Sequence, residues 1–392
     1  MIRKVGELDL GGKTVFLRVD FNVPIDQGKI MEPHRIESAL PTIRLILEHA
    51  HKLVIASHLG RPDGKVVPKY SLAPARDYLE TLLQRPVVLA PDCIGEEVER
   101  IVRDPTHRVV LLENLRFHKE EEKNDAGFSQ ALASLADVYV DDAFGAAHRA
   151  HASIVGMTAF FRSKGAGLLL QKELDYLSRV LLNPEKPFVT ILGGAKVSDK
   201  IGVVRNLLPK INMLLIGGGM AYTFLKAKGI AIGKSLVEND KLGLARELIK
   251  EAAEHGVALV LPVDHVTGDS AKKNAAVADI QIPPDRMGLD IGPKTVAQFS
   301  DEIRAARMVL WNGPVGLFEV EPYNQGSRAL ASTLAENHSR LVSIIAGGDT
   351  VAAVTAAGVA ARITHLSTGG GATLEFLEGK ELPGIKALEE NA

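Results

Sequence analysis

Basic side chains recur in the first half of the chain, each close after a short apolar run. RVDFNVP contains Arg18 and Asp20, SHLGRP contains His58 and Arg61, and ENLRFHKE contains Arg116. Arginine binds phosphate and carboxylate groups through paired, charge-assisted hydrogen bonds. The net charge of the chain is only −2, so any anion site must be a local cluster. These residues predict a site for a small, strongly anionic ligand.

Two further basic segments extend this pattern. Arg35 lies at the start of the first expected helix, and FGAAHRAHAS carries His148, Arg149 and His151. Ligands of open α/β sheets bind outside the carboxyl ends of the strands. We therefore expect the turns after the strands to bring these side chains together in one basic pocket.

The second half of the chain has glycine where the first half has arginine. Four segments run from an apolar strand through glycines into a helix start: FVTILGGAKVSDK, INMLLIGGGMAY, LVSIIAGGDTVAA and ITHLSTGGGATLEF. Glycine lets the backbone approach a ligand closely, and free N–H groups at helix N-termini attract phosphate oxygens. Four such turns predict a nucleotide site.

Charged residues in these turns fit nucleotide phosphates. Lys196 and Lys200 are four residues apart, so we expect them on one helical face, where both could reach a phosphate chain. Asp349 lies at an expected helix start, where it is a candidate Mg²⁺ ligand, although aspartate is also a common helix cap.

Spacing argues against other enzyme classes. The dinucleotide pattern G-x-G-x-x-G is absent, which disfavours a dehydrogenase. The segment GIAIGKS at 229–235 has three residues between its glycines where a phosphate-binding P-loop needs four, and no apolar strand precedes it. We find no Cys/His spacing typical of metal sites and no G-x-S-x-G motif.

Composition predicts a cytoplasmic protein that binds neither nucleic acid nor membrane. The single cysteine, Cys93, excludes an internal disulfide and favours a reducing compartment. The first residues lack the apolar run of a signal peptide, and no segment approaches the ~20 apolar residues that span a bilayer. A net charge near zero provides no general attraction for anionic polymers or lipids.

Ten short apolar runs, rich in β-branched residues, alternate with amphipathic helical patterns. They lie at 15–19, 52–57, 86–90, 108–112, 137–140, 188–192, 211–216, 257–262, 307–311 and 341–346. Strands that alternate with helices predict parallel sheets with helices on both faces. Ten strands are many for one sheet. The sequence therefore predicts an α/β protein with two Rossmann-like domains.

A long helix is expected to join the two domains. Leucines of GLLLQKELDYLSRVLLNPEKPF fall close to one helical face, and the prolines at 184 and 187 then stop the helix. The predicted boundaries are 1–170 for the first domain, 171–184 for the connecting helix and 185–379 for the second domain.

The sequence closely resembles the phosphoglycerate kinase family over nearly its whole length. The motifs that carry the resemblance occur in the family's order and are RVDFNVP, SHLGRP, PKYSLAP, LLENLRFH, DAFGAAHRAHAS, ILGGAKVSDKI, GGGMAYTFL, GLDIGPKT, WNGPVGLFE, GGDT and STGGGATLEFLEGKELPGI. The resemblance implies reversible phosphoryl transfer from 1,3-bisphosphoglycerate to ADP, giving 3-phosphoglycerate and ATP, in glycolysis and gluconeogenesis. It further implies Mg²⁺, direct in-line transfer after hinge closure, and a tail at 380–392 that packs on the first domain. We also expect a monomer.

The resemblance assigns site residues as well. It implies a phosphoglycerate-binding first domain, with His148 and His151 beside its pocket, in which the ligand is held by Asp20, Asn22, Arg35, His58, Arg61, Arg116 and Arg149. It implies a nucleotide-binding second domain, with Asp349 as the Mg²⁺ ligand, in which the nucleotide is held by Lys200, Gly217, Gly218, Gly288, Leu289, Glu319, Gly347, Gly348, Asp349 and Thr350. The implied catalytic groups are Arg35, Lys196, Gly347 and, in the glycine turn at 369–371, Gly370.

The chemistry agrees with such a site. In the reverse direction the nucleophile is a carboxylate, whose reference pKa of about 4 leaves it ionised at neutral pH. No proton must be removed, so cations and backbone amides suffice without a general base. The alternative is a catalytically silent, nucleotide-binding relative that acts as a scaffold. Replacement of Arg35, Lys196 or Asp349 would favour that alternative, and all three are present.

Overall fold

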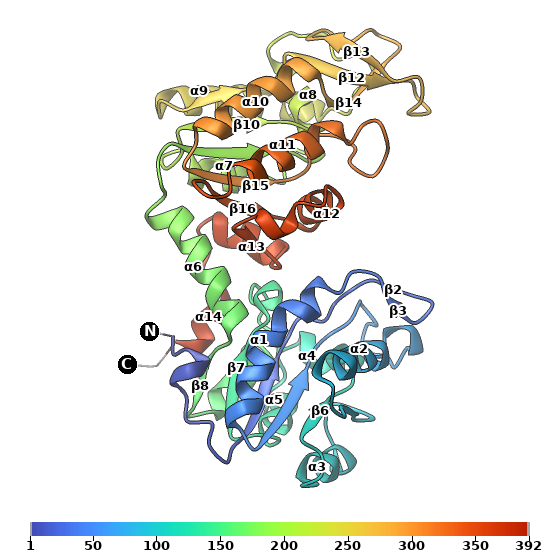
Figure 1. The fold of residues 1–392 in the computed structure, drawn as a ribbon, viewed down its shortest axis with the longest axis vertical. Helices are drawn as coiled ribbons and strands as arrows, with labels where there is room; N and C mark the ends of the chain where they lie inside the picture. The colour runs from blue at the N-terminus through green and yellow to red at the C-terminus, as the bar shows by residue number, and fades with distance from the viewer. Residues whose placement is uncertain (1, 390–392) are drawn as a thin grey trace. The chain divides into compact units, whose positions relative to one another are not determined.

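The computed structural model describes residues 2–389, which form two compact units (Figure 1). Unit 1 comprises Met1–Asp175 with Glu381–Ala392, and unit 2 comprises Tyr176–Lys380. The division falls inside helix α6 (Leu168–Leu182), in the segment predicted as a connecting helix.

Unit 1 is built on a six-stranded parallel sheet in the order β5-β6-β4-β1-β7-β8. Its strands are β1 (Thr14–Arg18), β4 (Lys52–Ala56), β5 (Val88–Leu89), β6 (Val109–Leu111), β7 (Val138–Asp141) and β8 (Lys164–Ala166). Its other elements are the hairpin β2 (Ile25–Asp26) and β3 (Lys29–Ile30), and the helices α1 (His34–His49), α2 (Ala73–Leu83), α3 (Glu96–Arg103), α4 (Lys119–Glu122), α5 (Ala126–Ala133) and α14 (Pro383–Leu388).

Unit 2 also has a six-stranded parallel sheet, in the order β11-β10-β9-β15-β16-β17. Its strands are β9 (Phe188–Leu192), β10 (Met213–Ile216), β11 (Ala258–Val260), β15 (Met308–Asn312), β16 (Val342–Ala346) and β17 (His365–Leu366). Its helices are α7 (Ile201–Leu207), α8 (Met220–Ala227), α9 (Leu242–Glu254), α10 (Pro293–Ala305), α11 (Gln325–Glu336), α12 (Gly348–Ala356) and α13 (Gly371–Leu377).

Burial explains why the strand segments are almost continuously apolar. Every residue of β4, β9 and β15 is buried, because helices cover the sheets. The prediction of two α/β parts, each on a parallel sheet, is confirmed. None of the described helices is both long and apolar enough to cross a membrane.

A smaller antiparallel sheet in unit 2 was not predicted. It has the order β13-β12-β14 and consists of β12 (Asp264–Gly268), β13 (Ala276–Asp279) and β14 (Met287–Ile291). β13 is mostly exposed, and each strand mixes polar with apolar residues. The apolar runs that identify buried strands are therefore missing here.

The C-terminal helix α14 packs within unit 1. The backbone N–H of Gly384 donates to the carbonyl of Ala147 at 2.8 Å. Leu382 and Leu388 are 2% and 0% exposed. A Cβ at Gly384 would lie 2.7 Å from a side-chain carbon of Ile154, so this close contact requires glycine.

Asp290 predicts a pH dependence of unit 2. Burial in β14 raises the pKa of Asp290 from an ordinary value of 3.8 to about 7, although Gly326 and Ile291 donate backbone hydrogen bonds to it. The folded state thus favours the protonated form. Its contribution to stability is complete below pH 3.8 and is lost as the pH rises toward 7, with a slope of at most about 1.4 kcal/mol per pH unit.

We expect Asp290→Asn to flatten this dependence. The single tryptophan, Trp311, is buried in unit 2, so its fluorescence during urea unfolding at pH 4.5 to 7.5 reports on this unit. The exposed Asp301→Asn should keep the wild-type pH profile. Identical profiles for wild type and Asp290→Asn would contradict the prediction.

Candidate active site

Neighbouring strands of unit 1 bring predicted site residues together at the carboxyl ends of the strands. Asp20 follows β1, His58 follows β4, and Arg116 lies in the 3₁₀ turn η3 (Leu115–Phe117) after β6. The sheet order β6-β4-β1 places these three strand ends side by side. All three side chains are buried. The strand ends therefore form the base of a polar site.

Hydrogen bonds between the turns hold this cluster together. Arg35 Nη1 donates to Asp20 Oδ2 at 2.6 Å. The Gly60 N–H donates to Asn22 Oδ1 at 2.9 Å, and Arg116 Nη1 donates to the Gly60 carbonyl at 2.8 Å. The turns after β1, β4 and β6 are thus fixed to one another by charged and amide side chains.

The cluster has a strongly positive electrostatic character. Burial lowers the pKa of His58 well below its ordinary value, and the nearby guanidinium groups of Arg18 and Arg116 lower it further. Burial, and then neighbouring guanidinium groups including that of Arg149, lower the pKa of His151 to about 3. Both imidazoles are therefore neutral at pH 7. Such a site attracts an anion, and neither of these two imidazoles could serve as an acid at that pH.

Arg61 and Arg149 are the exposed members of the predicted set. Arg61 directly follows Gly60 in the turn after β4. Arg149 Nε donates to His148 Nε2 at 3.1 Å. The structure thus places the residues predicted to bind the anionic substrate in the turns at the carboxyl ends of the strands, except Arg35, which lies in the first turn of α1.

A buried network beneath the cluster was not predicted as such. Arg18 Nε donates to Ser153 Oγ at 2.8 Å, and Arg18 Nη2 lies 3.1 Å from His58 Nδ1. The Ser153 hydroxyl in turn donates to Glu121 Oε1 at 2.6 Å. Glu121 is fully buried, although it lies in the run KEEEK, which resembles a solvated helix face. No local signal distinguishes this carboxylate from its exposed neighbours.

The glycine turns of unit 2 meet where the strand order reverses, between β9 and β15. A Cβ at Gly193 would lie 2.2 Å from the carbonyl oxygen of Pro314, and one at Gly313 would lie 2.4 Å from that of Gly193. A Cβ at Gly218 would lie 2.7 Å from the backbone nitrogen of Gly194. These glycines are required for turn-to-turn packing, whatever ligand they also approach.

Lys200 lies at the centre of this reversal point. Its ammonium group donates to Asn312 Oδ1, and Asn312 Nδ2 donates to the Ala346 carbonyl at 2.8 Å. Burial lowers the pKa of Lys200, while the carboxylates of Asp199 and Asp349 partly offset this effect. The ends of β9, β15 and β16 thus share a network of charged and amide groups.

The expected helical face for Lys196 and Lys200 is wrong. α7 begins at Ile201, so both lysines lie in the preceding turn, where Lys196 is exposed. The segment GGAKVSDK contains a residue with positive φ, Gly194 at 93°, and turns at 198–200 before the helix starts. The two lysines are positioned by a loop and not by helical periodicity.

The remaining phosphate-turn residues lie at two adjacent strand ends. Gly347, with φ of 90°, caps α12 after β16, and Gly370, with φ of 53°, caps α13 after β17. A Cβ at Gly348 would have no atom within 4 Å, so the space beside this residue is open. Thr350 Oγ1 accepts a hydrogen bond from the Gly313 N–H at 2.7 Å. Thr350 therefore links this turn to the end of β15.

The residues predicted to surround the adenine and ribose are connected through the segment 315–319. A Cβ at Gly217 would lie 2.7 Å from the side chain of Val315. The Leu289 carbonyl accepts a hydrogen bond from the Leu317 N–H at 2.8 Å. Glu319 follows as an exposed carboxylate.

Gly288 belongs to the same region. A Cβ at Gly288 would lie 2.2 Å from the Tyr222 hydroxyl. Glycine is needed at 288 because this hydroxyl occupies the space that a side chain would take.

Comparisons with known proteins agree with this arrangement. The model of the family described as phosphoglycerate kinase matches residues 5–380. The phosphoglycerate kinase of Koribacter versatilis is 54% identical over 396 residues, covering 98% of each chain. The cytosolic phosphoglycerate kinase of Triticum aestivum is 53% identical over 392 residues, again covering 98% of each chain.

The solved structure of phosphoglycerate kinase from Coxiella burnetii has a TM-score of 0.87 and 42% identity, with 99% of both chains covered. Matches of this extent cover both units and every turn described above. The chain therefore belongs to the phosphoglycerate kinase family, and it is a phosphotransferase.

Proposed function

We propose that this chain transfers a phosphoryl group reversibly from 1,3-bisphosphoglycerate to ADP, giving 3-phosphoglycerate and ATP. The observation that carries this proposal is the division of charge between the units. Unit 1 gathers guanidinium groups around neutral histidines at one sheet edge. Unit 2 gathers glycine turns at its strand-order reversal. The first arrangement suits a small polyanion, and the second suits a nucleotide.

Residues 1–170 with the tail at 380–392, all of which lie in unit 1 except Lys380, are the proposed phosphoglycerate-binding domain. Its ligand contacts are the side chains of Asp20, Asn22, Arg35, His58, Arg61, Arg116 and Arg149. Asp20 accepts a hydrogen bond from Arg35, and Asn22 accepts one from the Gly60 N–H. These two side chains thereby support the site by positioning Arg35 and the turn that contains Gly60. The guanidinium groups supply the charge that neutralises the phosphate and carboxylate of the substrate.

Residues 185–379, which lie within unit 2, are the proposed nucleotide-binding domain. Lys200 and the turn Gly347, Gly348 and Thr350 would hold the phosphates. Gly217, Gly218, Gly288 and Leu289 would surround the adenine, and Glu319 would accept hydrogen bonds from the ribose hydroxyls. The N–H groups at the start of α12 support the phosphate assignment, since helix N-termini attract anions.

Asp349 fits a Mg²⁺ ion that arrives with the nucleotide. Its carboxylate is exposed in the first turn of α12, and it lies close enough to Lys200 to affect the pKa of that lysine. Mg²⁺ typically keeps several waters and takes one or two protein carboxylates together with substrate phosphates. The single carboxylate of Asp349 beside the phosphate-binding turn is therefore sufficient to bind Mg²⁺ together with the nucleotide phosphates. When bound, the ion would neutralise charge on the phosphate oxygens.

The residues of the chain supply positioning and charge. The attacking carboxylate of 3-phosphoglycerate is ionised at pH 7, since its reference pKa is about 4. Arg35 and Lys196 stabilise the charge on the transferred phosphoryl group, aided by the backbone N–H groups at the Gly347 and Gly370 turns. Because these groups belong to different units, transfer requires a hinge closure, which also excludes water from the acyl phosphate.

A coupled assay tests the proposal. The purified chain, given 1,3-bisphosphoglycerate, ADP and Mg²⁺, should form ATP, and omission of either substrate should abolish the signal. Intact ADP binding without ATP formation would support a silent, scaffolding relative instead.

We further propose a cytoplasmic monomer. The single cysteine supports a reducing compartment, and the wheat relative is named cytosolic. Sedimentation equilibrium at assay concentration should give the mass of one chain, 42.1 kDa.

Arg61→Ala should mainly weaken binding of 3-phosphoglycerate. Its guanidinium is exposed beside the buried cluster, and a hydrogen bond to a charged group contributes about 1.5–3 kcal/mol, roughly a 10- to 150-fold rise in half-saturating concentration. Calorimetric titration should show unchanged ADP affinity. Arg100→Ala, on an exposed face of α3, is the matched control. Equal weakening of both ligands would refute the division of roles between the units.

A further inference from the structure

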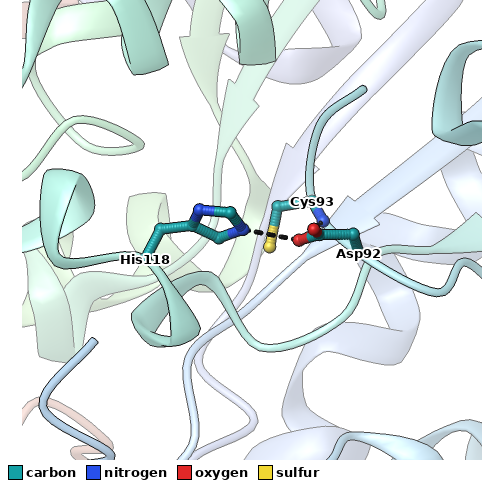
Figure 2. A group of neighbouring side chains, drawn as sticks. All are labelled: Asp92, Cys93 and His118. Atoms are coloured by element: carbon teal, nitrogen blue, oxygen red, sulfur yellow. Dashed lines mark hydrogen bonds and ion pairs between the residues drawn. The ribbon is translucent and has the colours of Figure 1, made fainter. Parts of the chain in front are cut away.

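A thiol, an imidazole and a carboxylate meet in unit 1 outside the site described above (Figure 2). Asp92 and Cys93 lie in the loop after β5, and His118 follows η3. One ligand atom from each side chain lies within 4.8 Å of the other two. Among residues 2–389, this is the one group of at least three histidine, cysteine, aspartate or glutamate side chains whose ligand atoms lie this close together.

We propose that Asp92, Cys93 and His118 form a binding site for Zn²⁺ or a similarly thiophilic divalent cation. Zn²⁺ binds thiolate sulfur, imidazole nitrogen and carboxylate oxygen at about 2.0–2.3 Å. Three protein ligands with a water in the fourth position is a familiar coordination for this ion. The set contains one donor of each of these types.

The backbone already holds the two loops together. The Ala90 N–H donates to the Leu111 carbonyl at 2.8 Å, and the Glu113 N–H donates to the Asp92 carbonyl at 3.4 Å. Cys93 Sγ donates to the Glu113 carbonyl at 2.9 Å. The thiol is thus anchored to the segment that leads into η3 and His118.

The three side chains face one another. His118 Nε2 lies 2.5 Å from Asp92 Oδ1, and the sulfur of Cys93 lies beside this hydrogen bond (Figure 2). The His118 ring packs against Phe128 with a centroid separation of 5.1 Å, which limits its orientation. A cation would replace the His118–Asp92 hydrogen bond and the thiol proton, because the thiolate is the metal ligand.

The three side chains differ in their exposure to solvent. The side chains of Asp92 and His118 are 49% and 24% exposed, whereas Cys93 is fully buried. A hydrated cation can therefore approach through Asp92 and His118 and reach the thiol behind them. The partial exposure of Asp92 and His118 makes these two ligands accessible to a cation from solvent.

Sequence spacing could not reveal this site. Asp92 and His118 are 26 positions apart, and the pairing of β5 with β6 brings their loops together. Arg116, which belongs to the basic cluster of the candidate active site, lies in η3, two residues before His118. Metal binding would therefore tie the β5 loop to the turn that carries Arg116.

Cobalt titration of the full chain tests the proposal. In excess Mg²⁺, which prefers oxygen ligands, Co²⁺ should produce a near-ultraviolet thiolate-to-cobalt band that saturates at one ion per chain. Added Zn²⁺ should abolish the band. Absence of the band in the wild type would overturn the proposal.

Variants identify the ligands. Cys93→Ser should remove the band, and His118→Asn and Asp92→Asn should each weaken Co²⁺ binding by at least the roughly 10- to 100-fold that loss of a supporting residue costs at metal sites. His107→Asn is the matched control, because His107 also faces a carboxylate, that of Asp104, but has no thiol beside it. Binding to a lone thiol, shown by unchanged affinity in both His118→Asn and Asp92→Asn, would overturn the three-ligand site even if Cys93→Ser fails to fold.

Discussion

Lys196→Ala should lower kcat by about 10²–10³-fold while the Kd for ADP changes little. Lys196 is exposed in the turn after β9. The ammonium group of Lys200, by contrast, donates a hydrogen bond to Asn312. A charge that meets its partner only when the phosphoryl group transfers stabilises the transition state more than the bound nucleotide. Steady-state kinetics in the ATP-forming direction and calorimetry with ADP measure the two quantities separately.

The matched control is Lys228→Ala, an exposed lysine at the C-terminal end of α8. It should leave both quantities at the wild-type level. If Lys196→Ala instead weakens ADP binding by the same factor with kcat unchanged, Lys196 acts in ground-state binding and its catalytic role is wrong.

Removal of residues 381–392 should destabilise unit 1 by about 3–6 kcal/mol, since each fully buried leucine contributes roughly 1.5–3 kcal/mol. Leu382 and Leu388 are the leucines concerned, and α14 is further joined to unit 1 by the hydrogen bond from Gly384 to Ala147. This loss is a large fraction of the 5–15 kcal/mol typical of folded domains. Hydrogen exchange should show reduced protection in residues 1–170, with ADP affinity nearly unchanged.

Point variants separate packing from chain length. Leu388→Ala should cost about 2–5 kcal/mol, as other buried leucine truncations do. Val66→Ala is the control in the same unit, because Val66 is 78% exposed. Unchanged protection of residues 1–170 in the truncated protein would show that the tail contributes nothing to the stability of this unit.

Residues with strong local periodicity were predictable from the sequence. All ten expected strand segments overlap a strand of one of the two parallel sheets, because doubly covered strands must be apolar on both faces. The connecting helix expected at 171–184 overlaps α6 at Leu168–Leu182, whose leucines recur at helical spacing before two prolines. The short edge strand β8 escaped prediction, since three residues are too few to show a period. The strand expected at the start of ITHLSTGGGATLEF is confirmed as β17.

The loops were less predictable. The turn before α7 contains Lys196 and Lys200 at helical spacing, yet helical hydrogen bonding starts only at Ile201. Gly194 adopts positive φ, and a Cβ at Gly218 would collide with its backbone. The conformation of this turn is set by packing against the β10 and β15 turns, which lie distant in sequence.

The sequence by itself determined the fold class, the family and the chemical character of each half, because strand periodicity, residue type and motif order are local properties. Only the tertiary structure decided which polar groups are buried and which ones meet. Glu121 became a fully buried acceptor for the Ser153 hydroxyl, which itself accepts a hydrogen bond from Arg18, and Cys93 came to lie beside His118. Such contacts depend on which strands are neighbours in the sheet, and strand order follows from packing the whole chain.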